Sequence, residues 1–271
     1  MRAASQRGTN PPCSGKSALP LRPIGRRRST RHDGSPRCIG RPVKATPRRA
    51  IELIEKRGLL LVFPIENRPE PRSLWSELYP RSPMRWAWDE GADPRVVSLW
   101  HLREALARSR KVVYAKWFRG RAMFFSRDVF RAMLASLRAT GGLFRGLSRD
   151  AQELLELLDD NSPQSTKELR RAAGLQGRML ETQWTHALKA LWSRMLIVGA
   201  GEVDDGAFPS LAVGSTKLLF EELWNEAARV LPGDEALLEG VLQDAPSFRK
   251  ELEKVRRGLQ KPDEPAIPMT G

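Results

Sequence analysis

The stretch STKELRRAAGLQGRMLETQWTHALKALWSRMLIVGAGEVDDGAFPSLAV, residues 165–213, decides the fold prediction. It opens with a capping box, in which the Ser165 hydroxyl and the Glu168 carboxylate each bond a free backbone amide at a helix start. Gly174 ends this short helix, and a second helix is expected from about Gly177. The second helix carries its apolar side chains at the three-and-four spacing of one buried face: Leu180, Trp184, Ala187, Leu188, Leu191 and Met195.

A β-hairpin is expected directly after these helices. Residues 196–198 form an apolar run, Asp204-Asp205-Gly206 has turn chemistry, and residues 208–213 return as a second strand. Helix, helix and hairpin, preceded by another helix, is the element order of a winged helix.

The first half of the chain predicts the same order of elements. Thr46 is a suitable N-cap and Pro47 a suitable first helical residue. The expected elements are a helix over Arg48–Lys56, a strand over Leu59–Phe63, a short helix over Ser73–Leu78, a helix over Pro94–Ser109 with Val97, Trp100, Leu102 and Leu106 near its buried side, and a hairpin with strands over Lys111–Trp117 and Ala122–Phe125. The repeated order predicts tandem winged helices.

The predicted fold class is mainly α with short β-hairpins (α+β), with tandem winged-helix (helix-turn-helix) domains and C-terminal helices. Ser215 is expected to cap a helix that carries Leu218, Leu219, Leu223 and Trp224, and two further helices are expected over 234–242 and 247–259. The predicted domains are a disordered basic arm (1–45), a first winged-helix-like domain (46–140), a second winged-helix domain (141–214), C-terminal helices (215–260) and a tail (261–271).

The net charge of +14 lies mostly in the first fifty residues, which hold thirteen basic residues and one acidic residue. Residues 1–45 have almost no apolar periodicity, so disorder is the expected state. Two hypotheses remain for this arm: it coats phosphates, or it is absent from the mature protein. We favour the second hypothesis, because Val43 is a plausible alternative start just before the first helix.

Composition also restricts the class of protein. Both cysteines, Cys13 and Cys38, lie in the arm, which excludes a disulfide framework from the folded part and fits a cytoplasmic location. No apolar run approaches the roughly 20 residues of a membrane helix, so no membrane span is expected. Nucleotide-binding and common catalytic motifs are missing, and His186 has no second ligand at metal spacing. We therefore expect no cofactor and no metal.

The first hairpin concentrates positive charge. Residues 101–150 hold twelve basic and three acidic residues. Lys111, Lys116, Arg119 and Arg121 alternate with the aromatic residues Tyr114, Trp117 and Phe118. This composition is typical of a wing that contacts phosphates and stacks on bases or wedges into a groove. The alternative is an ordinary solvated hairpin face.

The helix over Arg178–Arg194 is a candidate recognition helix. Thr182, His186, Lys189 and Ser193 share one exposed face, suited to phosphates and base edges in a major groove. The expected DNA contacts around it also include Lys167, Arg170, Arg171 and Arg178. The alternative is an amphipathic helix that serves a protein partner, since winged helices have both uses.

The runs VYAKWFRGRA (113–122) and LVFPI (61–65), together with the helix and wing unit that follows, resemble the AlkZ-related winged-helix proteins. These are similar to the bacterial DNA glycosylases AlkZ and YcaQ, which are built from tandem winged helices, remove alkylated bases and unhook interstrand crosslinks. The resemblance covers about Lys44 to Trp224. It implies DNA, duplex or damaged, as the partner.

The resemblance also implies a place for catalysis. The glycosylase signature is Gln-x-Gln or Gln-x-Asp after an early apolar strand, and the corresponding residues here are Pro64-Ile65-Glu66. Proline replaces the first glutamine, so only Glu66 is left to orient a water as a general base. Three hypotheses follow: a DNA-binding protein without catalysis, an active monofunctional glycosylase that uses Glu66, and a non-enzymatic module whose tryptophans and C-terminal helices bind a protein.

Overall fold

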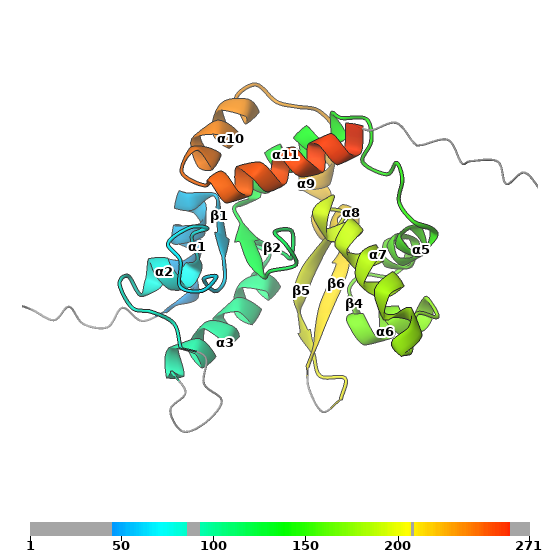
Figure 1. The fold of residues 1–271 in the computed structure, drawn as a ribbon, viewed down its shortest axis with the longest axis horizontal. Coiled ribbons are helices and arrows are strands. Elements are labelled where there is room, and N and C mark those ends of the chain that lie inside the picture. The colour runs from blue at the N-terminus through cyan, green and yellow to red at the C-terminus, as the bar shows by residue number, and fades with distance from the viewer. Residues whose placement is uncertain (1–44, 86–92, 207–208, 261–271) are drawn as a thin grey trace, which may run out of the picture. The chain divides into compact units, whose positions relative to one another are not determined.

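The structure is a computed structural model that describes residues 45–85, 93–206 and 209–260. The chain divides into a segment Met1–Arg41 and a compact unit Pro42–Gly271, and all described residues belong to the second. That unit is a mixed α+β structure, in which helices surround one antiparallel sheet (Figure 1). Residues 1–44 of the predicted arm lie outside the described residues.

The described elements fall into two repeats and a C-terminal group. The first repeat consists of α1 (Pro47–Arg57), β1 (Leu59–Leu61), α2 (Leu74–Leu78), α3 (Pro94–Ser109), β2 (Val113–Ala115) and β3 (Met123–Phe125). After α4 (Arg127–Arg138) the second repeat consists of α5 (Arg149–Asp160), β4 (Gln164–Ser165), α6 (Thr166–Ala172), a 3-10 turn (Arg178–Leu180), α7 (Glu181–Ser193), β5 (Ile197–Val203) and β6 (Ser210–Ser215). The C-terminal group is α8 (Thr216–Leu219), α9 (Glu221–Glu226), α10 (Asp234–Gln243) and α11 (Pro246–Gln260).

Two helix starts follow the capping residues in the sequence. The Thr46 hydroxyl accepts a bond from the Arg49 amide, with Pro47 at the first helical position. The capping box at α6 is formed as predicted: the Glu168 amide donates to the Ser165 hydroxyl, and the Ser165 amide donates to the Glu168 carboxylate.

The six strands form one continuous sheet in the order β1-β3-β2-β5-β6-β4. The two repeats meet where β2 pairs with β5, at Tyr114 opposite Gly199. A Cβ at Gly199 would lie 2.1 Å from the Tyr114 ring. Only glycine therefore allows this approach, and Gly199 is a structural requirement of the shared sheet.

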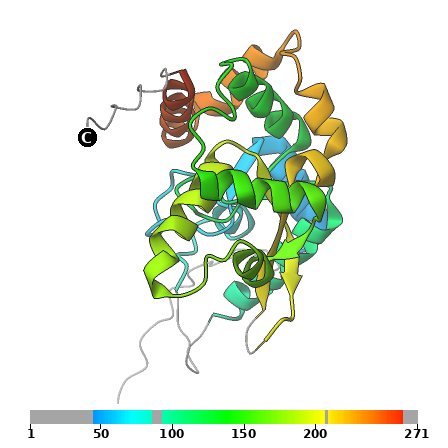
Figure 2. The ribbon, with the colours of Figure 1, turned by 90° about the vertical axis from the view of Figure 1, so that its right-hand side faces the viewer.

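Helices cover both faces of the first repeat's strands, so the strands β2 and β3 are buried throughout. Val113 and Ala115 pack into the core that includes α4, whereas Tyr114 and Phe124 pack into the core formed with α1 to α3. In Figure 1, α10 lies above α1 and β1, and α11 runs along the top from the first repeat toward the second. In Figure 2 the green to yellow-green helices of the second half lie in front of β5 and β6. A buried ion pair between Arg131 of α4 and Asp234 fixes α10.

Several expectations need correction. Val97 and Trp100 are not buried but 53% and 41% exposed, because the buried stripe of α3 passes through Leu99, Leu102 and Leu106 instead. The expected strands over Leu59–Phe63 and Lys111–Trp117 are each only three residues long. The helix expected after Ser215 is divided at Phe220, and the Ser215 hydroxyl bonds Asp159 instead of capping a helix.

Candidate nucleic-acid interface

A groove of about 400 Å³ lies between the β2–β3 connection, α7 and α11. Three elements that are distant in sequence each bring at least one basic side chain to its lining: Lys116 and Arg119, Lys189, and Lys254. The structure thus places three of the predicted DNA contacts, Lys116, Arg119 and Lys189, around one groove. Its one acidic lining residue is Glu251.

Buried aromatic side chains anchor the tip of the β2–β3 hairpin. Trp117 and Phe118 are buried, and the Phe118 ring meets the Phe248 ring of α11 edge to face with centroids 4.9 Å apart. Arg119 and Gly120 take left-handed backbone angles at the turn, with φ of 51° and 71°. The predicted use of Tyr114, Trp117 and Phe118 for base stacking is therefore wrong, because the core uses all three.

Arg119 lies on the outside of this turn. Its guanidinium sits over the Phe118 ring at 4.9 Å and reaches to 3.9 Å from the Glu251 carboxylate. Glu251 is also 3.3 Å from Lys254 of the same helix. One carboxylate thus faces two cations, which leaves the groove with an excess of positive charge.

Lys116 is half-buried in the wall of the groove. Burial, with a smaller repulsion from Arg103, lowers the pKa of its ammonium. Among the described residues Lys116 makes no hydrogen bond and no ion pair. An anion in the groove would supply the counter-charge that the described side chains do not.

Helix α7 turns two tryptophans inward and its polar face outward. Trp184 and Trp192 are buried, whereas Thr182, His186 and Lys189 are exposed, as predicted for a recognition face. Only Lys189 of these three, with Ser193 near the helix end, lines the groove. Thr182 and His186 continue the exposed face beyond it.

The cations around α6 have different surroundings. Lys167 pairs with Asp205 at 3.0 Å, and hydrogen bonds from Ser165, then from Ser210 and Lys167, hold the pKa of Asp205 at about 2. Arg170 bonds the Leu175 and Gly177 carbonyls and the Glu181 carboxylate. These two cations therefore have structural partners. Three other predicted contacts, Arg171, Arg178 and Arg121, are exposed and lie outside the groove lining.

Glu66 lies outside the lining of the groove formed by the first hairpin, α7 and α11. Its side chain is 68% exposed, it pairs with Arg68 at 2.5 Å, and its backbone φ is 51°. The Asn67 side chain fixes this loop by two hydrogen bonds with the Met84 backbone, of 2.7 and 2.9 Å. Next to the loop is a cavity of about 350 Å³, with Trp75 and Tyr79 in its wall and Glu66 outside its lining.

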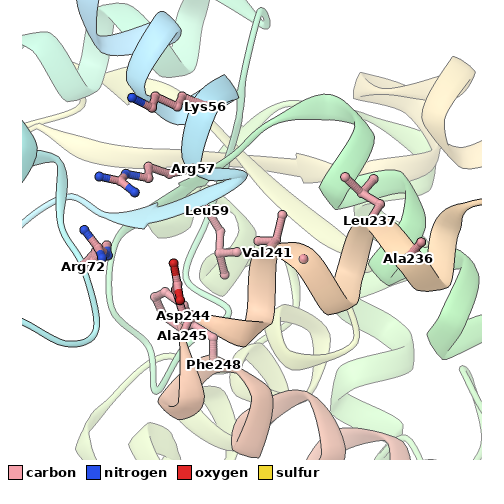
Figure 3. A pocket seen from close by; sticks show the side chains of 11 residues that line it. Lys56, Arg57, Leu59, Arg72, Ala236, Leu237, Val241, Asp244, Ala245 and Phe248 are labelled. Atoms are coloured by element: carbon pink, nitrogen blue, oxygen red, sulfur yellow. The ribbon is translucent and has the colours of Figure 1, made fainter.

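A further cavity, of about 380 Å³, separates α1 and β1 from α10 (Figure 3). Lys56, Arg57 and Arg72 extend on one side of it, and Leu59 and Val241 face each other across it. Both arginines bond Glu77, at 3.2 and 3.5 Å. Each of these two arginines therefore has a carboxylate partner within the protein, which Lys116 lacks among the described residues.

Sequence reasoning missed the part of the groove that α11 contributes. Glu251 and Lys254 stand three residues apart on a predicted helix, but no local pattern indicates that this helix packs against the first hairpin. The described residues contain no group of histidine, cysteine or carboxylate side chains that could hold a metal. None of the helices in the described part is long and apolar enough to cross a membrane.

A family model described as AlkZ related matches residues 45–236. The match includes both repeats and the first residues of α10, and it leaves out α11. Comparisons with curated proteins and with solved structures gave no match. Since the family model covers well over half of the sequence, the chain belongs to the AlkZ-related family.

Proposed function

We propose that this protein binds duplex or damaged DNA through a tandem winged-helix unit, and that the groove between the first hairpin, α7 and α11 is the centre of the interface. The family links the chain to proteins related to DNA-repair glycosylases. The observation that carries the proposal is the convergence of Lys116, Arg119 and Lys189 on one groove.

The proposed winged-helix classification rests on topology. Each repeat has the order helix, strand, helix, helix, strand, strand, and in each the first strand pairs with the third. In this classification α3 and α7 are the third helices, and the β2–β3 and β5–β6 hairpins are the wings. The proposed domains are residues 46–140 and 141–214, followed by the C-terminal helices over 215–260.

Electrostatics supports DNA as the ligand. Phosphate contacts by lysine and arginine release counterions, so they supply most of the non-specific affinity of a DNA-binding protein. Lys116 has no counter-ion within the described structure, and Arg119 shares Glu251 with Lys254. A phosphate in the groove would pair with Lys116 and Arg119, and it would raise the pKa of Lys116 back toward its ordinary value.

A salt series tests the proposal. Binding of a fluorescent duplex is measured for the full chain and for a shortened chain that begins at Lys44, because the basic arm alone can bind DNA. Arg119→Ala and Lys189→Ala should each weaken binding at low salt, and each should reduce the slope of log K against log salt by about 0.9. Arg48→Ala, which removes an exposed charge from α1, is the matched control. Equal slopes for all variants would refute the proposal.

Base excision is a second candidate function, because a cavity with aromatic walls lies beside the Glu66 loop. Trp75 and Tyr79 would enclose an extruded base, and Glu66 would act as general base on a water. The test compares excision from alkylated and crosslinked duplexes by the wild type and by Glu66→Gln. Abasic product from the wild type alone supports this function. Equal product from both, or none from either, excludes Glu66 as the base.

A further inference from the structure

The most exposed large apolar side chain of the described residues is Met179, at 90% exposure. It lies in the 3-10 turn Arg178–Leu180 that leads directly into α7. Leu180, the next residue, packs partly against the core. Met179 therefore projects from the start of the proposed recognition helix without a contact that would explain an apolar residue there.

The backbone under Met179 is fixed by hydrogen bonds. Arg170 donates to the Leu175 carbonyl at 2.7 Å and to the Gly177 carbonyl at 3.2 Å, and it also bonds Glu181 at 2.7 Å. One side chain thus joins both ends of the turn to α6. Because the backbone of this turn is already fixed, binding a ligand there costs little further loss of backbone conformational entropy. An exposed side chain on the turn is therefore held in position for a ligand.

The side chains around Met179 are cationic or polar. Arg171 and Arg178 are exposed, and their side chains make no hydrogen bond or ion pair within the described structure. In the other direction Met179, Thr182, His186 and Lys189 follow the three-and-four spacing of one helix face. Along this face the apolar Met179 comes first, the hydrogen-bonding Thr182 and His186 follow, and Lys189 lies at the groove. The face extends over ten residues, or about 15 Å.

We infer that Met179 is an apolar wedge that enters a base step of the DNA bound along α7, with Arg171 and Arg178 on the flanking phosphates. The inference rests on the proposed function and adds a residue that deforms the duplex. Apolar wedges partially unstack a base step and kink the helix, while nearby cations hold the backbone. A lipid surface would also accept a methionine among arginines, but the hydrogen-bonding groups of Thr182 and His186 favour base edges over acyl chains.

The test uses the full chain and duplexes that carry 2-aminopurine, whose fluorescence rises when it is unstacked. At saturating protein, the wild type should raise the fluorescence, and Met179→Ala should lose most of this rise while its Kd stays within about threefold. Met179→Leu, which keeps an apolar side chain, should retain the rise. Arg178→Ala should weaken binding and leave the rise at saturation unchanged. Unchanged melting temperatures confirm that the exposed substitutions leave the fold intact.

The outcomes distinguish the claim that the protein binds DNA from the claim that Met179 acts as a wedge. An equal rise for the wild type and for Met179→Ala, or no rise despite tight binding, overturns the wedge and leaves DNA binding standing. Absence of binding by the wild type overturns both. Binding of anionic phospholipid vesicles that is lost in Met179→Ala, with no fluorescence rise on DNA, assigns Met179 to a membrane surface and also overturns the wedge.

Discussion

The β2–β3 connection and the β5–β6 connection occupy the same place in the two repeats, yet they carry opposite charge. The first carries Arg119 and Arg121, and aromatic side chains anchor it to α11. The second carries Asp204 and Asp205, and Asp205 pairs with Lys167. The second hairpin therefore uses the charge of Asp205 within its own repeat, whereas under the proposed function the charge of the first hairpin serves a DNA ligand.

The third helices differ in a similar way. Helix α3 is tied to the second repeat, because Arg103 forms a nearly buried ion pair with Glu202 of β5. Within α3, the Arg103 guanidinium lies 3.9 Å from the centroid of the Trp100 ring. Helix α7 instead exposes the polar side chains Thr182, His186 and Lys189. Under the proposed function, the same order of elements serves two purposes: the first repeat would supply a basic wing, and the second would supply the helix that contacts the bases.

The largest expected effect on stability comes from breaking the Arg103–Glu202 ion pair that joins the two repeats. Arg103→Ala leaves the Glu202 carboxylate nearly buried without its partner, so the free energy of unfolding should fall by about 3–5 kcal/mol. Urea denaturation measures this loss. Arg127→Ala, which breaks a surface pair with Glu222, should cost less than about 1 kcal/mol.

A double-mutant cycle sharpens this result. Arg103→Ala combined with Glu202→Ala should cost less than the sum of the single changes, since no charge is left unpaired. Additive losses would mean that the pair does not join α3 to β5.

The sheet junction gives the next largest effect. Gly199→Ala places a methyl group 2.1 Å from the Tyr114 ring, and the overpacking should cost about 1–3 kcal/mol in urea denaturation. Gly240→Ala is the matched control, because it lies within α10 with open space at the Cβ position, and it should stabilise by up to about 1 kcal/mol. A neutral Gly199→Ala would contradict the close approach of β2 and β5.

A smaller effect concerns the charge of the groove. Glu251→Gln removes the one acidic lining residue, so duplex affinity at low salt should rise about two- to threefold. Glu153→Gln, on the exposed side of α5, removes the same charge elsewhere and should change affinity less. Equal effects of the two substitutions in fluorescence anisotropy would show that only net charge matters.

The smallest effect distinguishes the second hairpin. The folded-state pKa of Asp205 is about 2, against an ordinary value of 3.8, so the unfolded state binds the proton more readily. Its stabilising contribution is therefore complete above about pH 4 and is lost as the pH falls towards 2. The stability difference between the wild type and Asp205→Asn should shrink over this range in pH-dependent denaturation. A constant difference would argue against the hydrogen bonds from Ser165 and Ser210 that, with Lys167, lower the pKa of Asp205.

Local sequence signals predicted most helix boundaries. Thr46, Pro47 and the Ser165 capping box act through bonds within one turn, and α3 has the predicted bounds Pro94–Ser109. Apolar spacing alone does not locate the buried side of α3, which also includes Arg103 through its ion pair with Glu202 of β5. That contact joins residues about one hundred positions apart and leaves no periodic signal.

The candidate site was predictable only in parts. Positive charge at Lys116, Arg119 and Lys189 is visible in the sequence, but their common groove depends on the sheet that joins the repeats. The same packing buries Trp117 and Phe118, which composition alone suggested for stacking on bases. The contribution of α11 depends on the contact between Phe118 and Phe248, and no local rule predicts it.

The most direct test of the central claim is the salt dependence of duplex binding by the chain that begins at Lys44, with and without Arg119→Ala and Lys189→Ala together. If the groove binds DNA, the double variant should lose about two from the slope of log K against log salt, and Lys167→Ala should lose almost nothing. An unchanged slope in the double variant, with binding otherwise intact, would contradict the account and place the interface elsewhere.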